Sequence, residues 1–233
     1  MPDFAKRSDS KELLDGNAIP FEDIRQNMEE LDAINHRLGG HRITILGVKA
    51  ILKKWNNSSP VHVVEIGCGG GDNLRVVKNW GVQKGLQFQL TGIDINPECI
   101  RFAQEKKGNE GMQFICADYR EAVLTHQPDI VFSSLFCHHF TDAELVAQLT
   151  WMRQNSSLGF FINDLHRHPL AYYSMQFLTK AFSKSYLVKN DAPLSVMRGF
   201  KRKEWKTLLK EAGLQNTNVQ WQWAFRWLIL SYS

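Results

Sequence analysis

One stretch of this chain sets its fold: Val61-His62-Val63-Val64-Glu65-Ile66-Gly67-Cys68-Gly69-Gly70-Gly71-Asp72. Its first half is a short apolar run rich in valine, which is typical of a buried parallel strand. A glycine-rich turn follows, and the residues after the turn predict a helix. Glycines let a backbone approach a ligand closely, and the free N–H groups of a helix start can face that ligand. The stretch therefore predicts a strand, a ligand-binding turn and a helix.

Length and composition predict a globular protein of ordinary domain size. The chain has 233 residues, of which 43% are hydrophobic, and a net charge of +4, which does not require a nucleic-acid partner. The four cysteines lie far apart without a C-x-x-C pair, so free thiols in a reducing compartment are expected. Because no apolar run reaches membrane-spanning length and the N-terminus is polar, we expect a cytoplasmic protein.

Strand and helix patterns alternate from residue 61 onward. Further strands are expected at 86–93, 112–117, 130–134 and 158–163, with helices at 97–107 and 142–153. This alternation predicts a doubly wound α/β sheet that binds its ligand at the carboxyl ends of the strands. We expect four parts: an N-terminal helical cap (1–60), the α/β core (61–164), an insertion (165–200) and a C-terminal helix with final strands (201–233).

The flanking parts have less regular patterns. Residues 9 to about 55 look helical, with breaks at Pro20 and at Gly39-Gly40, and 56–60 predict a turn. The insertion is expected to hold one helix, 170–182, and an irregular stretch around residues 191–193. A helix at 202–212 and one or two strands within 219–230 are expected to end the fold.

The spacing of the glycines excludes two common nucleotide sites. A dinucleotide fingerprint needs G-x-G-x-x-G, but Asp72 stands where the third glycine would be. A phosphate-binding P-loop needs Gly-Lys-Ser/Thr, which does not follow. The stretch instead fits E-x-G-x-G-x-G, beginning at Glu65, and acidic residues also end the next two predicted strands, at Asp94 and Asp118.

These motifs, in this order, resemble those of the class I S-adenosylmethionine-dependent methyltransferases. The resemblance covers residues 61–164 and rests on Glu65-Ile66-Gly67-Cys68-Gly69-Gly70-Gly71, Gly92-Ile93-Asp94-Ile95-Asn96, Cys116-Ala117-Asp118-Tyr119 and Val131-Phe132-Ser133-Ser134-Leu135-Phe136-Cys137-His138-His139. It implies a Rossmann-like, seven-stranded, mostly parallel sheet with S-adenosyl-L-methionine as cofactor. It also implies that the N-terminal helices and the insertion after the fifth strand form a substrate lid.

The resemblance implies a role for each motif residue. The loop from Gly67 to Gly71 suits the carboxylate of the cofactor, and Glu65 suits its ammonium group. Asp94 would accept hydrogen bonds from the ribose hydroxyls, and Asp118 from the adenine amino group. The predicted cofactor-binding residues are Glu65, Gly67, Cys68, Gly69, Gly71, Asp94, Ile95, Asp118, Tyr119, Ser134 and Leu135.

Methyl transfer from a sulfonium needs alignment of nucleophile, methyl group and sulfur, and a hydroxyl nucleophile also benefits from a base. Histidine titrates near neutral pH and suits that task. Four histidines follow the fourth and fifth predicted strands and are the candidate catalytic residues: His138, His139, His166 and His168. The alternative is that His138 only orders its loop and that His166 and His168 lie on the surface of the insertion. No spaced second cluster indicates a metal site.

The insertion predicts an apolar acceptor site. It carries several aromatic side chains, and its string from Asp164 to Ala171 resembles small-molecule methyltransferases of bacterial polyketide, aryl-lipid and quinone pathways. The candidate substrate-binding residues are Arg167, Tyr172, Tyr173 and Arg198. We expect O-methylation of a small, phenolic or lipid-like acceptor. A quinone-type C-methyltransferase, an RNA methyltransferase and a non-catalytic cofactor-binding protein remain alternatives, and the oligomeric state is open.

Overall fold

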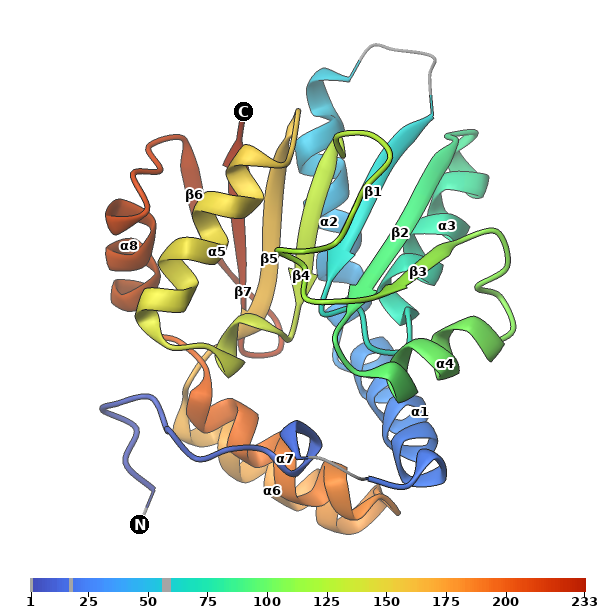
Figure 1. Ribbon diagram of the computed structural model, residues 1–233. Coiled ribbons are helices and arrows are strands. Elements are labelled where there is room, and N and C mark those ends of the chain that lie inside the picture. Colours follow the sequence, from blue (N-terminus) through green and yellow to red (C-terminus); the bar gives the residue numbers. More distant parts are fainter. Residues whose placement is uncertain (1, 17–18, 56–59) are drawn as a thin grey trace.

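A computed structural model describes residues 2–16, 19–55 and 60–233. Its centre is a seven-stranded sheet in the order β3-β2-β1-β4-β5-β7-β6 (Figure 1). The strands are β1 (Val61–Ile66), β2 (Phe88–Asp94), β3 (Gln113–Cys116), β4 (Ile130–Ser134), β5 (Gly159–Leu165), β6 (Thr217–Gln222) and β7 (Arg226–Tyr232). Strands β1 to β5 pair in parallel, and β7 runs antiparallel to both of its neighbours. The predicted α/β class and the mostly parallel, seven-stranded sheet are confirmed.

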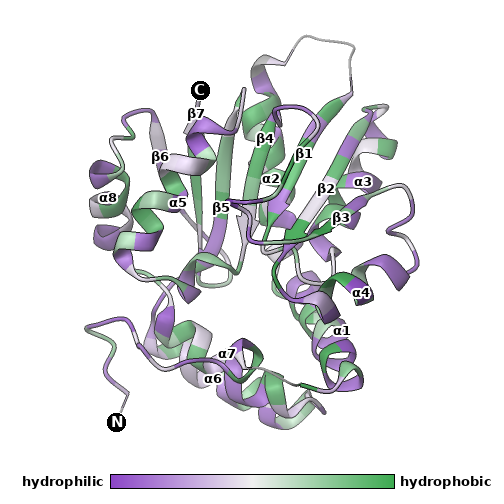
Figure 2. Ribbon diagram, viewed as in Figure 1, coloured by the Kyte–Doolittle hydropathy of each residue, from purple (hydrophilic) through white to green (hydrophobic). Residues whose placement is uncertain are grey.

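Helices cover both faces of this sheet. The helices α2 (Gly40–Ile51), α3 (Asp72–Lys84) and α4 (Pro97–Glu105) pack on one face, and α5 (Asp142–Gln154) and α8 (Arg202–Glu211) on the other. Strand β1 contributes to the core on both faces of the sheet. Val63 packs with the residues under α2, α3 and α4, and Val64 packs with those under α5 and α8. Side chains of a strand alternate between faces, so a strand covered on both sides needs a continuous apolar run. Figure 2 shows this concentration of apolar residues along the central strands.

A second group of elements lies across the edge where the parallel strands end (Figure 1). It contains the single turns η1 (Leu13–Asp15) and η3 (Cys137–His139) and the helices α1 (Phe21–Arg37), α6 (Pro169–Phe182) and α7 (Tyr186–Arg198). The predicted N-terminal and insertion segments thus meet at the edge where doubly wound sheets bind ligands. Their role as a substrate lid, and the division into four parts, stay predictions.

Two local predictions were wrong. Residues around 191–193 are not irregular but lie inside α7, with Pro193 within the helix. Proline removes one backbone donor, but packing against α6 and the N-terminal segment holds this helix together. Residues 9–16 contain one short turn, η1, instead of a long helix. The predicted break at Gly39-Gly40 is observed, because α2 begins at Gly40 directly after Gly39, whose φ is +80°. The predicted turn at 56–60 falls mostly outside the described residues.

No helix in the described ranges combines the length and the apolar character that a membrane crossing requires.

Candidate active site

The turn after β1 has the backbone conformation that its glycines predict. Gly67 has φ +66° and Gly71 has φ +72°, values that residues with a side chain rarely adopt. A Cβ on Gly67 would lie 2.1 Å from the ring of Phe136, so this position also excludes a side chain by contact. Helix α3 begins at Asp72 directly after the turn, and its free N–H groups therefore lie beside the loop.

Glu65 is the second-last residue of β1, next to this loop, and its carboxyl group is buried. Neither carboxyl oxygen has a hydrogen-bond partner among the described residues. Burial raises the pKa of Glu65 well above its ordinary value, the carboxylates of Asp72 and Asp94 raise it further, and the neighbouring Asn73 side chain offsets this only in part. A buried acceptor without a donor is costly, so the position calls for a cationic or hydrogen-donating ligand.

Asp94 connects the end of β2 to the same loop. Its two carboxylate oxygens accept backbone N–H groups, Oδ2 from Gly69 at 2.8 Å and Oδ1 from Asn96 at 2.9 Å. Burial nevertheless raises the pKa of Asp94. The residue lines a cavity and each oxygen retains a lone pair, so Asp94 can accept further hydrogen bonds from a pair of hydroxyl groups.

A cavity of about 750 Å³ opens along the loop and the ends of β1, β2 and β4. Its volume lies within the range of about 300–1,000 Å³ that small-molecule sites occupy. Nine of the predicted site residues line it: Glu65, Gly67, Cys68, Gly69, Asp94, Ile95, Ser134, Leu135 and His139. Apolar side chains line much of the remainder, from η1, α1 and the β4 loop: Leu14, Ile19, Ile24, Met28, Leu31, Phe136 and Phe140.

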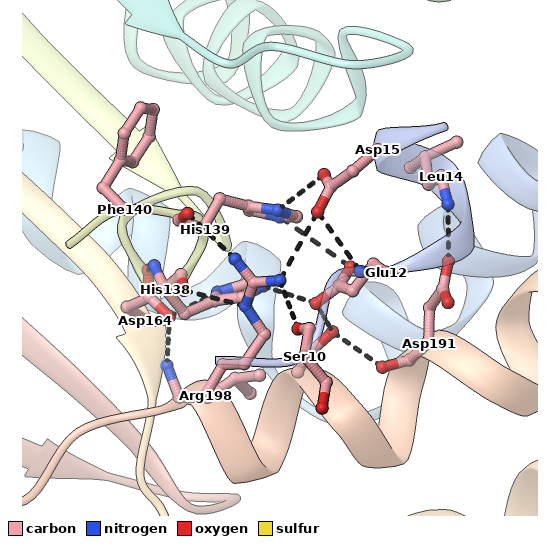
Figure 3. Close-up of polar contacts among 12 residues, drawn as sticks. Ser10, Glu12, Leu14, Asp15, His138, His139, Phe140, Asp164, Asp191 and Arg198 are labelled. Atoms are coloured by element: carbon pink, nitrogen blue, oxygen red, sulfur yellow. Dashed lines mark hydrogen bonds and ion pairs between the residues drawn. The ribbon is translucent and has the colours of Figure 1, made fainter. Parts of the chain in front are cut away.

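The loop after β4 carries His138 and His139 on the single turn η3 (Figure 3). Nδ1 of His138 lies 2.9 Å from Oδ1 of Asp164, and Nδ1 of His139 lies 3.0 Å from Oδ1 of Asp15. His138 is buried behind the cavity wall, whereas His139 is part of the wall. Burial lowers the pKa of His138, but Asp164 and Glu12 outweigh burial and raise it to about 9.

An N-terminal strap, residues 3–16, supplies side chains that the motifs did not indicate. Glu12 and Asp15 reach the histidine pair from this strap (Figure 3). The strap is held on α7, because the buried carboxylate of Asp191 accepts the N–H groups of Leu13 at 2.8 Å and Leu14 at 3.0 Å. No motif in the sequence placed Glu12 beside residues 138–139.

The other two candidate histidines do not line the cavity. Rings of His166 and His168 pack against Phe225, and Nδ1 of His166 accepts a hydrogen bond from the indole of Trp221 at 3.3 Å. Burial lowers the pKa of His166 to about 4, with His168 and Arg167 adding to the effect. His168 instead caps α6 by accepting the N–H of Leu170. The structure therefore separates this pair from His138 and His139.

The candidate substrate residues also lie outside the cavity wall. Arg167 is fully buried and pairs with Glu204, and its guanidinium also donates to the carbonyl oxygens of Phe4 and Ala5. Arg198 is buried and donates to the carbonyl oxygens of His138 and His139. Arg198 thus joins the N-terminal segment to the β4 loop, and Arg167 joins it to α8. Tyr172 and Tyr173 pack edge-on against each other and around Phe4.

Three predicted cofactor residues stand beside the cavity rather than in its wall. Asp118 pairs with Arg120, and its pKa is lowered mainly by this hydrogen bond. Tyr119 is buried in the core with its ring 5.0 Å from that of Trp151. Gly71 packs beneath the loop, where a Cβ would meet Phe114 at 2.9 Å. Their contacts with the cofactor stay predictions.

Comparisons with known proteins agree with this geometry. Residues 63–157 match a family model described as a methyltransferase domain. The trans-aconitate 2-methyltransferase of Acidovorax sp. is 30% identical over 84 residues, which are 36% of this chain and 30% of the relative. The plantazolicin methyltransferase BpumL, solved with SAH, superposes with a TM-score of 0.63 at 16% identity, covering 91% of this chain and 95% of its own. Residues 63–157 thus match a methyltransferase domain, and the fold is that of methyltransferases solved with SAH or SAM.

The sequence similarity to curated relatives extends over little more than a third of this chain. The malonyl-[acyl-carrier protein] O-methyltransferase of Acetivibrio thermocellus is 26% identical over 87 residues, 37% of this chain and 29% of the relative. The chain thus spans about 30% of the length of the curated relatives it matches. Human N-acetylserotonin methyltransferase, solved with SAM, shares the fold with a TM-score of 0.61 at 18% identity, over 92% of this chain and 56% of its own.

Proposed function

We propose that this chain transfers a methyl group from S-adenosylmethionine to a small, apolar acceptor that presents an oxygen nucleophile. The observation that carries the proposal is the buried, unpartnered carboxyl of Glu65 beneath a glycine loop that opens into a cavity. An ammonium group would supply the missing donor there, and the N–H groups at the start of α3 would bind a carboxylate next to it. Asp94 would accept the ribose hydroxyls. The residues present therefore fit the cofactor of this family.

Most of the rate enhancement would come from residues of the chain that align the acceptor with the methyl group of the cofactor. When bound, S-adenosylmethionine supplies an electrophilic methyl group whose leaving group is a neutral thioether. Leu135 and Phe136 turn the β4 loop over the glycine loop, with φ +54° at Leu135, and confine the end of the cavity beside His139. The apolar wall excludes water and favours an apolar acceptor. Alignment of two reactants in this way can supply roughly 7–11 kcal/mol of the barrier.

The histidine pair would act on the nucleophile. A hydroxyl acceptor must lose its proton, and a side chain that assists typically contributes about 10²–10⁴-fold. His139 lies in the cavity wall with its Nδ1 held by Asp15, so its Nε2 is the atom available for this task. The aromatic or lipid-like character of the acceptor rests on the apolar side chains of η1, α1 and the β4 loop.

The first test is binding of S-adenosylhomocysteine by calorimetry, to the chain and to Asp94→Ala. Loss of the hydrogen bonds to the ribose should weaken binding roughly ten- to a hundredfold, because hydrogen bonds to charged groups contribute about 1.5–3 kcal/mol. Glu211→Gln, an exposed position on α8, is the matched control and should bind as the parent does. Equal affinity of Asp94→Ala and the parent would remove Asp94 from the site.

The second test is a methyl-transfer assay against phenols, quinols, aryl acids and RNA. Transfer to the oxygen of a small acceptor, with His139→Ala reducing kcat more than cofactor affinity, is the expected result. Transfer to ring carbon would favour the C-methyltransferase alternative, and transfer to RNA alone would contradict the proposal. Tight cofactor binding without transfer to any acceptor would favour a non-catalytic binding protein.

A further inference from the structure

Glu12, His138 and His139 bring three potential metal-ligand atoms together at the acceptor end of the cavity. One atom from each lies within 4.8 Å of the other two. Nε2 of His138 is 3.4 Å from Oε1 of Glu12, and Nε2 of His139 is 3.8 Å from Oε2 of the same carboxylate. Both imidazoles therefore point the same ring nitrogen at one carboxylate, which Figure 3 shows between them and the strap.

The opposite ring nitrogens are already occupied by other carboxylates. Nδ1 of His138 lies 2.9 Å from Asp164, and Nδ1 of His139 lies 3.0 Å from Asp15, both ordinary hydrogen-bond distances. An Nδ1–H that donates to a carboxylate leaves the lone pair of Nε2 exposed toward Glu12. Carboxylates that fix the tautomer and orientation of a histidine in this way accompany most histidine ligands of metal ions.

Carboxylates surround the two imidazoles: Glu12, Asp15 and Asp164. Arg198 lies 3.4 Å from Asp15, and Arg7 pairs with Asp142. Among the described residues, no lysine or arginine pairs with Glu12. A cation between the imidazoles and Glu12 would be either added protons or one divalent ion.

Geometry favours the ion over the protons. A proton between Nε2 and a carboxylate would give a charge-assisted hydrogen bond of about 2.7–2.9 Å, whereas the separations here are 3.4 and 3.8 Å. Ligand atoms at about 2.0–2.2 Å from a tetrahedral zinc ion lie roughly 3.3–3.5 Å from one another. Two protonated rings would also repel, because the ring centroids of His138 and His139 are 4.4 Å apart.

We propose that Glu12, His138 and His139 bind one divalent transition-metal ion, with Zn²⁺ the best match to two imidazoles and one carboxylate. Three protein ligands leave a fourth coordination position, as in catalytic zinc sites. His139 and Asp15 line the cavity, so this position is reached from the cavity and can take an oxygen of the acceptor. This inference rests on the proposed function: with Nε2 of His139 bound to the ion, the ion would replace His139 as the group that acidifies a hydroxyl acceptor, as zinc does for bound water.

A second cluster of acidic and histidine side chains is already paired with neighbouring residues. Asp32, His41 and Asp72 also gather three ligand atoms within 4.8 Å. There the guanidinium of Arg75 pairs with Asp32, and Asn35 donates to Asp72 at 3.0 Å, while His41 lies at hydrogen-bond distance, 2.7 Å, from Asp72. This cluster has its cation, Arg75, paired with one of its own three residues, whereas Glu12 accepts from the hydroxyl of Ser195 at 2.7 Å and has no lysine or arginine partner among the described residues.

The test is zinc binding by the full chain, without cofactor or acceptor, so that its outcome is independent of methyl transfer. The chain is loaded with Zn²⁺, dialysed and measured by mass spectrometry, and cobalt substitution is followed by visible d–d absorption. We expect about one ion per chain, lost in Glu12→Gln and His139→Gln. Asp164→Asn should weaken binding about 10–100-fold, the usual effect of removing a carboxylate that orients a ligand.

His168→Ala is the matched control, since it removes a histidine from the other histidine pair and should leave the stoichiometry unchanged. Stoichiometry of the parent chain decides the matter even where a variant fails to fold. A parent chain that retains no zinc and shows no cobalt spectrum overturns the proposal in favour of protonated histidines. Equal loss of metal in His168→Ala and Glu12→Gln would overturn it as well, because binding would then be general to histidines.

Discussion

Glu65 is a buried acidic residue in the cavity wall, and neither of its carboxyl oxygens has a hydrogen-bond partner among the described residues. Its carboxyl is buried without a donor, next to two other acidic side chains, and its pKa is therefore raised well above 4.5. Such a group costs stability in the cofactor-free chain and is useful only when a ligand supplies the missing donors. The carboxyl therefore lowers the stability of the cofactor-free chain, and its expected role is to bind the ligand.

Glu65→Gln should stabilise the cofactor-free chain at pH 8 and weaken its binding of S-adenosylhomocysteine. The parent's pKa is higher in the folded state, so its stability is fully present below about pH 4.5 and is lost as the pH rises through the raised value. Glutamine has no such loss. The difference in Tm should therefore be positive at pH 8, about 2–4 °C for each kcal/mol, and vanish near pH 4.5. A variant less stable than the parent at pH 8 would contradict this account.

The turn between β1 and α3 is an element that needs glycine for two separable reasons. One is the positive φ of its backbone, and the other is the close approach of Phe136 from the β4 loop to Gly67. Helix α3 ends at Gly85, which has the same φ of +66°, but there a Cβ would have open space around it, with no described atom within 4 Å. Gly85 therefore serves as a control for Gly67, because it has the same φ but no contact like the one with Phe136.

Gly67→Ala should lower the free energy of unfolding more than Gly85→Ala does. Strain from positive φ, roughly 1 kcal/mol or more, is common to both. The Gly67 variant adds a clash at 2.1 Å with Phe136, worth about a further 1–3 kcal/mol for an overpacked site. Urea denaturation measures both values. Equal losses would mean that the β4 loop moves aside freely and that the loop contact is weak.

Across the molecule, buried arginines join the N-terminal strap to the rest of the fold. Arg198 on α7 contacts the strap at the carbonyl of Ser10 and the β4 loop at the carbonyls of His138 and His139. Arg167 after β5 does the same for the strap at Phe4 and Ala5. Segments more than a hundred residues apart in sequence are thereby fixed around one cavity.

Arg198→Lys should loosen the strap while the sheet stays folded, because one ammonium cannot replace a planar fork that serves several acceptors. Amide hydrogen exchange at residues 3–16 should become at least about tenfold faster, the effect of losing roughly 1.4 kcal/mol of local stability. Exchange in β1 and β4 should not change. Arg37→Lys, at an exposed position on α1, serves as control. An unchanged strap would show that Asp191 and Arg167 suffice to hold it.

Local sequence patterns were enough to predict the sheet, the glycine turn and the residues at the strand ends. A buried parallel strand needs a continuous apolar run, and a close backbone approach needs glycine, so both leave patterns that can be read without a structure. Glu65 and Asp94 follow from the same logic, since parallel strands end at one edge of the sheet. Even the antiparallel partner β7 was expected as a final apolar strand.

Packing between distant segments, in contrast, determines which polar side chains meet at the acceptor end. Four histidines with similar positions after strands divided into a pair beside the cavity and a pair against Phe225, and two arginines expected at a substrate proved to be buried supports. Glu12 reaches His138 across more than a hundred residues. Contacts of this kind depend on shared burial between parts of the chain that are far apart, and no periodicity in the sequence encodes them.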